Sequence, residues 1–195
     1  MWDCVNRLGR TDEAIPMFRK SLEIEPTAAG FSNLASLYWY QGRYSDAVPL
    51  YEKATEMAPT RALYWKNLAE TYAKVSDLKD RAREAHLRAI ELMKGQLAIN
   101  PNDANLRVDL AGSFAALKDE SNALVHVAQA RRIVPNDSRI LYKAVYVYLD
   151  LGRKDQAANA LDLALQNGYS LAEVRESPDL AALLKDPRFK RFEQK

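Results

Sequence analysis

Histidine, cysteine and acidic side chains are the groups from which a catalytic or metal site could be built in this chain. The sequence holds two histidines, His86 and His126, and a single cysteine, Cys4. Cys4 has no basic neighbour in sequence, so an inert thiol is a better interpretation than a nucleophile. The two histidines lack the spacing of a metal site, and one thiolate cannot complete a zinc site. We therefore expect no metal, no cofactor and no catalysis by this chain.

Other classes of function are disfavoured by charge and composition. The formal net charge is only +2, and acids and bases are interleaved, so the chain lacks the basic patch typical of nucleic-acid binding. The most apolar stretch, residues 145–149, is bounded by Lys143 and Asp150 and is far shorter than the ~20 residues that span a bilayer. A glycine-rich phosphate loop and the kinase signatures are also missing. A lone cysteine suits a reducing, cytoplasmic compartment.

What recurs along the chain is apolar and lies at helical spacing. A small alanine is followed four residues later by a larger residue, and a proline closes the first four of these stretches, so one helix face is repeated. The alanines are Ala14, Ala47, Ala82, Ala123 and Ala157, and the prolines are Pro26, Pro59, Pro101 and Pro135. The alanines lie 33 to 41 residues apart.

A second signature precedes most of these alanines. Its clearest copies begin at Phe31 and Trp65, each followed by Leu-Ala three residues later and by a tyrosine seven residues later. Weaker copies begin at Arg107 and Leu141. The turn glycines Gly9, Gly42 and Gly152 separate the two signatures. Each unit is therefore predicted to be a helix, a tight turn and a second helix.

This combination resembles the tetratricopeptide repeat family, whose pattern is W-x2-L-G-x2-Y, then A-x3-F, then P. The resemblance implies an all-α fold: an α-α superhelix of about five helical hairpins with a short C-terminal helical cap. The expected units are residues 1–26 (partial), 27–59, 60–101, 102–135 and 136–168, with a cap at 169–195. The chain departs from the pattern where His86, Val127 and Leu161 replace the aromatic residue, and where Arg107 replaces tryptophan.

The unit at 60–101 is longer than the others between its alanine and its proline. Seven extra residues make about two helical turns, so the apolar face of the second helix stays in phase. Ala89, Met93 and Leu97 continue that face. We expect an elongated second helix here, because the alternative, a loop insertion, has only Gly95 as a helix breaker.

The C-terminal residues indicate a cap on the last unit. Ser170 and Glu173 have the spacing of a capping box, and Ser177-Pro178 and Asp186-Pro187 are typical starts of short helices. The segments 166–169, 179–184 and 186–189 resemble the C-terminal tetratricopeptide regions of bacterial eukaryote-like serine/threonine kinases and related signalling proteins. That resemblance implies a regulatory or sensor region of a larger signalling enzyme or transcription regulator, whose catalytic domain lies outside this chain.

In this family the first helix of each unit lines a concave groove that binds a protein or peptide, so the resemblance implies that the outward residues of these helices bind the partner. The predicted partner-binding residues are Asn33, Ser36, Trp39, Tyr40, Lys66, Asn67, Glu70, Lys74, Asp109, Arg139, Tyr142, Lys143 and Tyr146. For Trp39 and for the tyrosine pair at 142 and 146, packing inside the array is the alternative to groove exposure.

Two narrower expectations concern the kind of partner. Some family members clamp a C-terminal carboxylate between basic and asparagine side chains. Here Glu70 and Asp109 stand at the asparagine positions and would repel a carboxylate, so we expect no such clamp. A ligand of mixed or basic charge is an equally good candidate near Glu70 and Asp109. A further alternative is self-association through the partial first unit, where Trp2 and Val5 leave an apolar edge.

Overall fold

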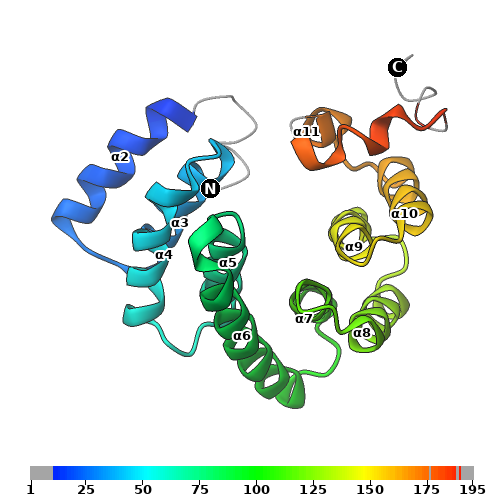
Figure 1. Ribbon diagram of the computed structural model, residues 1–195, viewed down its shortest axis with the longest axis horizontal. Helices are drawn as coiled ribbons and strands as arrows, with labels where there is room; N and C mark the ends of the chain where they lie inside the picture. Colours follow the sequence, from blue (N-terminus) through cyan, green and yellow to red (C-terminus); the bar gives the residue numbers. More distant parts are fainter. Residues whose placement is uncertain (1–10, 176, 188, 190–195) are drawn as a thin grey trace. The chain divides into compact units, whose positions relative to one another are not determined.

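The computed structural model describes residues 11–175, 177–187 and 189 as helices joined by turns (Figure 1). The described residues contain no strand, so the predicted all-α fold class is confirmed. None of the described helices is long and apolar enough to cross a membrane. The long helices are α2 (Thr11–Ile24), α3 (Ala28–Tyr40), α4 (Tyr44–Met57), α5 (Ala62–Ala73), α6 (Lys79–Ile99), α7 (Ala104–Ala116), α8 (Glu120–Ile133), α9 (Ser138–Asp150) and α10 (Lys154–Gln166).

The chain divides into two compact units, Met1–Leu92 and Met93–Lys195, and the division falls within α6. In the first unit α3 packs against α2 and α4, and α4 packs against α5. Buried leucines, tyrosines and alanines from α3 to α6 form one continuous core. Among them are Leu34, Tyr38, Tyr51, Leu68 and Tyr72, each no more than 3% exposed. The expected first helix of the partial unit, with Cys4, Gly9, Trp2 and Val5, lies outside the described residues.

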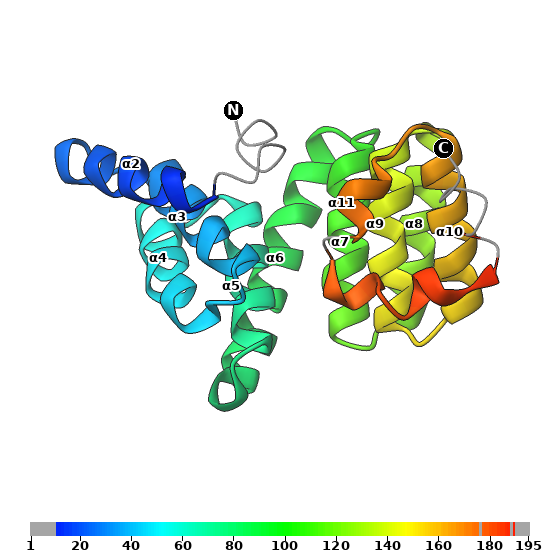
Figure 2. The same ribbon diagram turned by 90° about the horizontal axis from the view of Figure 1, so that it is seen from above.

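In the second unit α7 packs against α8 and α9, and α9 packs against α10 (Figure 2). Helices α7 and α9, the first helices of their pairs, therefore lie side by side, and α8 packs against both of them (Figure 1). Alanine makes this close packing possible, since Ala111, Ala123, Ala144 and Ala157 are all fully buried. The small residues that repeat in the sequence are thus the contact points between helices.

Tight turns with a left-handed glycine join α3 to α4 and α9 to α10. Gly42 has φ 71° and Gly152 has φ 73°. After Gly152, the backbone N–H of Arg153 donates to the Tyr148 carbonyl at 2.8 Å, and that of Gly152 to the Leu149 carbonyl at 2.9 Å. This pair of hydrogen bonds is the Schellman motif, which satisfies the last carbonyls of a helix. The turn glycines at 42 and 152 therefore work as the sequence predicts.

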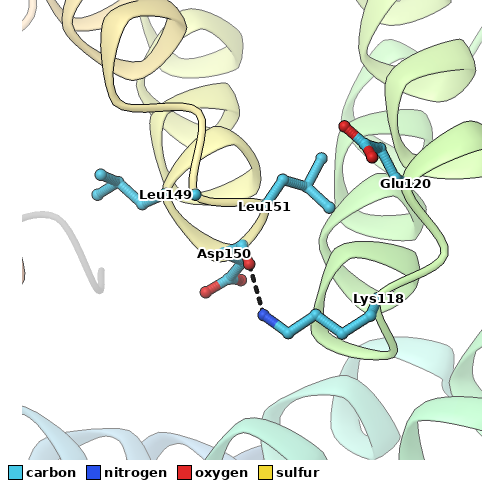
Figure 3. Close-up of a pocket in the computed structure, with 6 residues that line it drawn as sticks. Lys118, Glu120, Leu149, Asp150 and Leu151 are labelled. Atoms are coloured by element: carbon cyan, nitrogen blue, oxygen red, sulfur yellow. Dashed lines mark hydrogen bonds between the residues drawn. The ribbon is translucent and has the colours of Figure 1, made fainter.

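The α7–α8 turn uses Lys118 instead of glycine, with φ 62°. Its ammonium donates to the backbone oxygen of Asp150 at 2.5 Å. This bond lies at the edge of an open hollow between the α7–α8 turn and the α9–α10 turn (Figure 3). A second link joins the same turns, since the Arg153 guanidinium contacts the Glu120 carboxylate at 2.5 Å. The turns of neighbouring hairpins in the second unit are therefore connected by side chains.

Helix α6 is the longest, with 21 residues, against 14 in α4 and α8 and 13 in α10. It runs unbroken through Gly95 to Ile99, where the sequence predicts a continued helix rather than a loop. Leu97 and Met93 are buried, and Ile99 at its end is 87% exposed. The extra turns are therefore helical.

The described part of the C-terminal segment includes the short helices α11 (Leu171–Arg175), η2 (Pro178–Leu180) and η3 (Leu183–Lys185). The Ser170 hydroxyl accepts from the backbone N–H of Glu173 at 3.3 Å, which is one half of the expected capping box. Val174, Leu180 and Phe189 are at most 2% exposed, and each such burial is worth about 2 kcal/mol. The segment is thus packed into the fold. The predicted features at Arg188 and beyond 189 lie outside the described residues.

Candidate partner-binding surfaces

The predicted partner-binding residues fall on two separate surfaces, one in each unit. The first-unit surface comprises Asn33, Ser36, Trp39 and Tyr40 on α3 with Lys66, Asn67, Glu70 and Lys74 at α5. The second-unit surface comprises Asp109 on α7 with Arg139, Tyr142, Lys143 and Tyr146 on α9. Each surface is described below by itself.

The floor of the first-unit surface is a pair of hydroxyl groups. Ser36 is only 7% exposed, and its hydroxyl lies 2.7 Å from that of Tyr51 on α4. It also donates to the Ser32 carbonyl at 2.9 Å. Burial raises the pKa of Tyr51, and the Ser36 hydrogen bond opposes that rise only in part. Ser36 therefore lies beneath the exposed residues and is hydrogen-bonded to Tyr51. Tyr51 was not among the predicted partner-binding residues.

An ion pair lies above this floor on α5. The Lys66 ammonium contacts the Glu70 carboxylate at 2.7 Å, across one helical turn. The Lys66 side chain is 15% exposed and the Glu70 side chain is 41% exposed. The pair therefore buries its cation and presents its anion to solvent. Asn33 on α3 and Asn67 on α5 are half-buried, and Lys74 is exposed at the C-terminal cap of α5.

His86 of α6 lies behind the same helix face and is 4% exposed. Burial lowers its pKa to about 4, the Glu70 charge opposes this shift, and the Lys66 charge adds to it. Its Nδ1 atom is buried without a hydrogen-bond partner. A neutral, buried imidazole of this kind is a packing residue rather than an acid–base group at neutral pH.

The aromatic residues at the end of α3 divide between packing and exposure. Trp39 is half-buried against the core, and its ring meets the edges of Tyr40 at 5.3 Å and of Tyr44 at 5.7 Å. Tyr40 is 56% exposed. Trp39 therefore packs inside the array, which was the alternative to groove exposure. Tyr40 presents its ring to solvent.

The ion pair of the second-unit surface joins two first helices. The Lys143 ammonium of α9 donates to both carboxylate oxygens of Asp109 on α7, each at 3.1 Å. Here the Lys143 side chain is 40% exposed and the Asp109 side chain 17%, so the cation faces solvent. Arg139 is exposed in the first turn of α9, beside the capping residue Asp137.

Tyr142 and Tyr146 are engaged by the C-terminal segment of the chain. The Tyr142 ring stacks on Tyr169 at 4.0 Å, and its hydroxyl lies 2.8 Å from that of Tyr146. The Tyr146 hydroxyl lies 2.9 Å from the Ser177 hydroxyl. The contacts of these tyrosines thus join α9 to the cap. Sequence reasoning missed Tyr169 and Ser177, although an aromatic residue directly after the turn glycine Gly168 was an available signal.

The described residues offer no group of three or more His, Cys, Asp or Glu side chains that could hold a metal ion. On the two surfaces Lys66 instead pairs with Glu70, and Lys143 pairs with Asp109. The arrangement therefore provides polar, charged and aromatic contacts for another molecule.

Comparison with family models assigns most of the chain to one family. Models described as tetratricopeptide repeat match residues 3–60, 32–104 and 138–167. Together these matches cover well over half of the sequence. A comparison with curated proteins finds no match.

Solved structures with similar folds include a repeat protein. TTC0263, a thermophilic TPR protein in Thermus thermophilus, aligns with a TM-score of 0.65 at 22% identity, covering 92% of this chain and 95% of that one. A MamA AMB-1 structure aligns with a TM-score of 0.51 at 19% identity, covering 84% and 93%. A MamA RS-1 mutant aligns with a TM-score of 0.52 at 13% identity, covering 85% and 89%. At these identities the likeness supports the fold alone.

Proposed function

Because the chain belongs to the tetratricopeptide repeat family, we propose that it is a protein-interaction scaffold whose first-helix surfaces bind a partner protein or peptide. Repeat folds of this kind present extended surfaces on a preformed array, so little ordering cost is paid on binding. The partner would contact the first-unit surface or the second-unit surface defined above.

The observation that carries this proposal is how the two surfaces are built. Their charged residues are held in defined positions, Lys66 by Glu70 at 2.7 Å and Lys143 by Asp109 at 3.1 Å, above helices with a closed core. Pre-positioned polar groups give specificity without new ordering on binding. The same ion pairs support the expectation that no carboxylate clamp exists, because each lysine already has a carboxylate partner in the chain.

A photo-crosslinking experiment tests the proposal. A photoreactive amino acid placed at Asn67 on α5, or at Arg139 on α9, is expected to capture a partner from cells of the source organism. The same group at Lys53 on α4, an exposed second-helix position, serves as the matched control. Mass spectrometry of the adducts identifies the partner. Equal capture from all three positions, or from the control alone, would contradict a binding site on the first helices.

A second candidate role is that of a regulatory region within a larger bacterial signalling protein. The favouring observation is the C-terminal segment, whose residues 166–169 and 186–189 resemble the kinase-linked group. We infer that partner binding to this array would regulate a catalytic or DNA-binding domain elsewhere in that protein. The sequence of the surrounding gene is the test, and a gene that encodes no such domain would remove this role.

Self-association is a third candidate role, and its proposed edge, Trp2 and Val5, lies outside the described residues. Light scattering over a range of concentrations separates it from partner binding. A mass that rises with concentration supports self-association, and a constant monomer mass removes it.

A further inference from the structure

The first unit contains a contact made of three parts: a ring, a cation and an acid. The Arg81 guanidinium lies 4.5 Å from the Tyr72 ring centre and 2.8 Å from the Glu52 carboxylate. The Tyr72 hydroxyl donates to the same carboxylate at 2.6 Å. The carboxylate therefore neutralises the cation that lies over the ring.

The same three parts recur at Tyr38. The Arg43 guanidinium lies 4.4 Å from the Tyr38 ring centre and 2.7 Å from the Asp46 carboxylate. Tyr38 and Tyr72 take the same position in their units, three residues after a fully buried alanine of the first helix. At both positions, the cation over the ring is paired with an acid of the chain.

Phe114 takes this position in α7, and the cation over its ring is not paired in this way. The Lys94 ammonium of α6 lies 5.3 Å from the Phe114 ring centre, and both residues belong to the second unit. Lys94 is exposed, and no carboxylate among the described residues forms a salt bridge with it. Asp119, the residue before α8, already accepts from the backbone and side-chain nitrogens of Asn122 at 3.2 and 2.7 Å. These hydrogen bonds lower the pKa of Asp119, and the Lys94 charge lowers it least.

Two more basic side chains lie near the same ring. The His126 imidazole of α8 stacks on Phe114, with ring centres 5.7 Å and planes 11° apart. Gln129, one turn after His126, accepts a hydrogen bond from the Arg107 guanidinium. Burial lowers the pKa of His126, and the positive charges of Arg107 and Lys94 lower it further. Positive charge therefore gathers around Phe114.

We propose that these four residues bind an acidic side chain of a partner protein. The Phe114 cluster consists of Lys94, Arg107, Phe114 and His126. The partner's carboxylate pairs with the Lys94 ammonium, as Glu52 pairs with the cation over the Tyr72 ring. No residue of the first-unit or second-unit surface belongs to the Phe114 cluster, so this site goes beyond the proposed function and adds a separate contact.

Arg107 and His126 have different roles in the Phe114 cluster. The Arg107 guanidinium already donates to the Pro101 carbonyl and to Gln129, so it contributes charge rather than a new hydrogen bond. The Nδ1 atom of His126 is buried without a hydrogen-bond partner in the described residues. A carboxylate bound nearby favours the charged form of an imidazole. Binding of the acidic side chain should therefore raise the pKa of His126.

Fluorescence anisotropy with the full chain tests the proposal. The probe is a fluorescein-labelled peptide in which glutamates alternate with serines, compared with a matched lysine peptide. The glutamate peptide is expected to bind and the lysine peptide is not. Lys94→Gln should weaken glutamate-peptide binding about fivefold. Lys154→Gln is the matched control, because Lys154 is an exposed lysine at the start of α10 in the same unit, and it should leave the affinity unchanged.

NMR titration of the two histidines gives a second measurement. The pKa of His126 should rise when the glutamate peptide is bound, and His86 in the first unit serves as the internal reference. The proposal is overturned if the glutamate peptide does not bind, if Lys94→Gln and Lys154→Gln have equal effects, or if the peptide binds without raising the pKa of His126. A matched phosphoserine peptide that binds more tightly would assign the site to a phosphate and overturn the carboxylate ligand. Circular dichroism should show that both variants are folded.

Discussion

Trp65 and Arg107 stand at the same position of their units and make the same hydrogen bond, although Arg107 replaces the tryptophan of the pattern. The Trp65 indole N–H donates to the Pro59 carbonyl at 2.9 Å. The Arg107 Nε–H donates to the Pro101 carbonyl, also at 2.9 Å and across the same six-residue interval. Both side chains thus hold the proline-containing loop against the helix that follows it. An apparent departure from the repeat pattern therefore preserves its interaction.

His86 replaces an aromatic residue in the core, and we expect it to make stability depend on pH. Burial lowers its folded pKa to about 4, below the 6.5 of an exposed histidine. The unfolded chain therefore binds the proton more strongly. The histidine's contribution is fully present above pH 6.5 and is lost as the pH falls towards 4, by about 3 kcal/mol at most.

The variant His86→Phe restores the family's aromatic residue and removes this proton-linked loss. Urea unfolding near neutral pH and in acid measures the free energy of unfolding of both proteins. The variant should lose less stability on acidification than the original chain. Equal losses in the two proteins would show that His86 is not the group responsible.

Lys118 takes a backbone conformation that favours glycine, with φ 62°. A left-handed conformation costs a residue with a Cβ atom about 1 kcal/mol. Lys118→Gly and Lys118→Ala both lose the bond to the Asp150 carbonyl, but only the glycine variant relieves the strain. We expect Lys118→Gly to be about 1 kcal/mol more stable than Lys118→Ala in thermal unfolding. If the alanine variant is at least as stable as the glycine variant, the left-handed conformation at position 118 is not strained.

At the scale of helices, two helical glycines should respond oppositely to substitution by alanine. A Cβ atom at Gly95 in α6 meets nothing within 4 Å, so Gly95→Ala should stabilise the protein by up to about 1 kcal/mol. At Gly30 in α3 it would lie 2.8 Å from Leu22 Cδ2 and 2.9 Å from Thr27 Oγ1. Thr27 caps α3 by accepting from the Gly30 N–H. We therefore expect Gly30→Ala to lower the unfolding midpoint in urea and Gly95→Ala to raise it.

The cap depends on hydroxyl bonds from α9. Tyr146→Phe keeps the ring but loses the bonds to Tyr142 and Ser177, at a cost of about 1 kcal/mol. The buried Val174 and Leu180 should hold the segment in place, so we expect faster hydrogen exchange at residues 170–180 rather than global unfolding. Tyr44→Phe in the first unit is the control. Unchanged exchange at 170–180 would show that these bonds do not hold the cap.

The helices could be predicted from the sequence because their signals are local. Ala47 and Tyr51, or Gly42 before α4, indicate a helix face or a turn within a few residues. The role of Tyr142 was not predictable in this way, because it depends on how the distant Tyr169 packs after the chain reverses. Trp39 and Tyr40 show the same limit: two adjacent aromatic residues differ in exposure because only one of them points towards the core.

For the whole molecule, the presence of two compact units predicts that stability is not uniform along the chain. In repeat folds each hairpin is stabilised mainly by its neighbours, so a defect weakens its own surroundings first. Leu141 in α9 is 1% exposed, and Leu141→Ala should cost about 3 kcal/mol by leaving a cavity. Hydrogen exchange should then rise in α7 to α10 while α3 to α5 keep their protection.

The reciprocal variant, Leu34→Ala in α3, removes a leucine that is 3% exposed in the first-unit core. It should raise hydrogen exchange in α3 to α5 and leave α7 to α10 protected. This pattern is the reverse of the one expected for Leu141→Ala. If either variant instead lowers protection equally in both units, the chain unfolds as one cooperative block. The partner-binding surfaces would then be stabilised together rather than separately. Under the expected outcome, a partner that binds the first-unit surface stabilises that unit alone, by an amount set by its concentration relative to its dissociation constant.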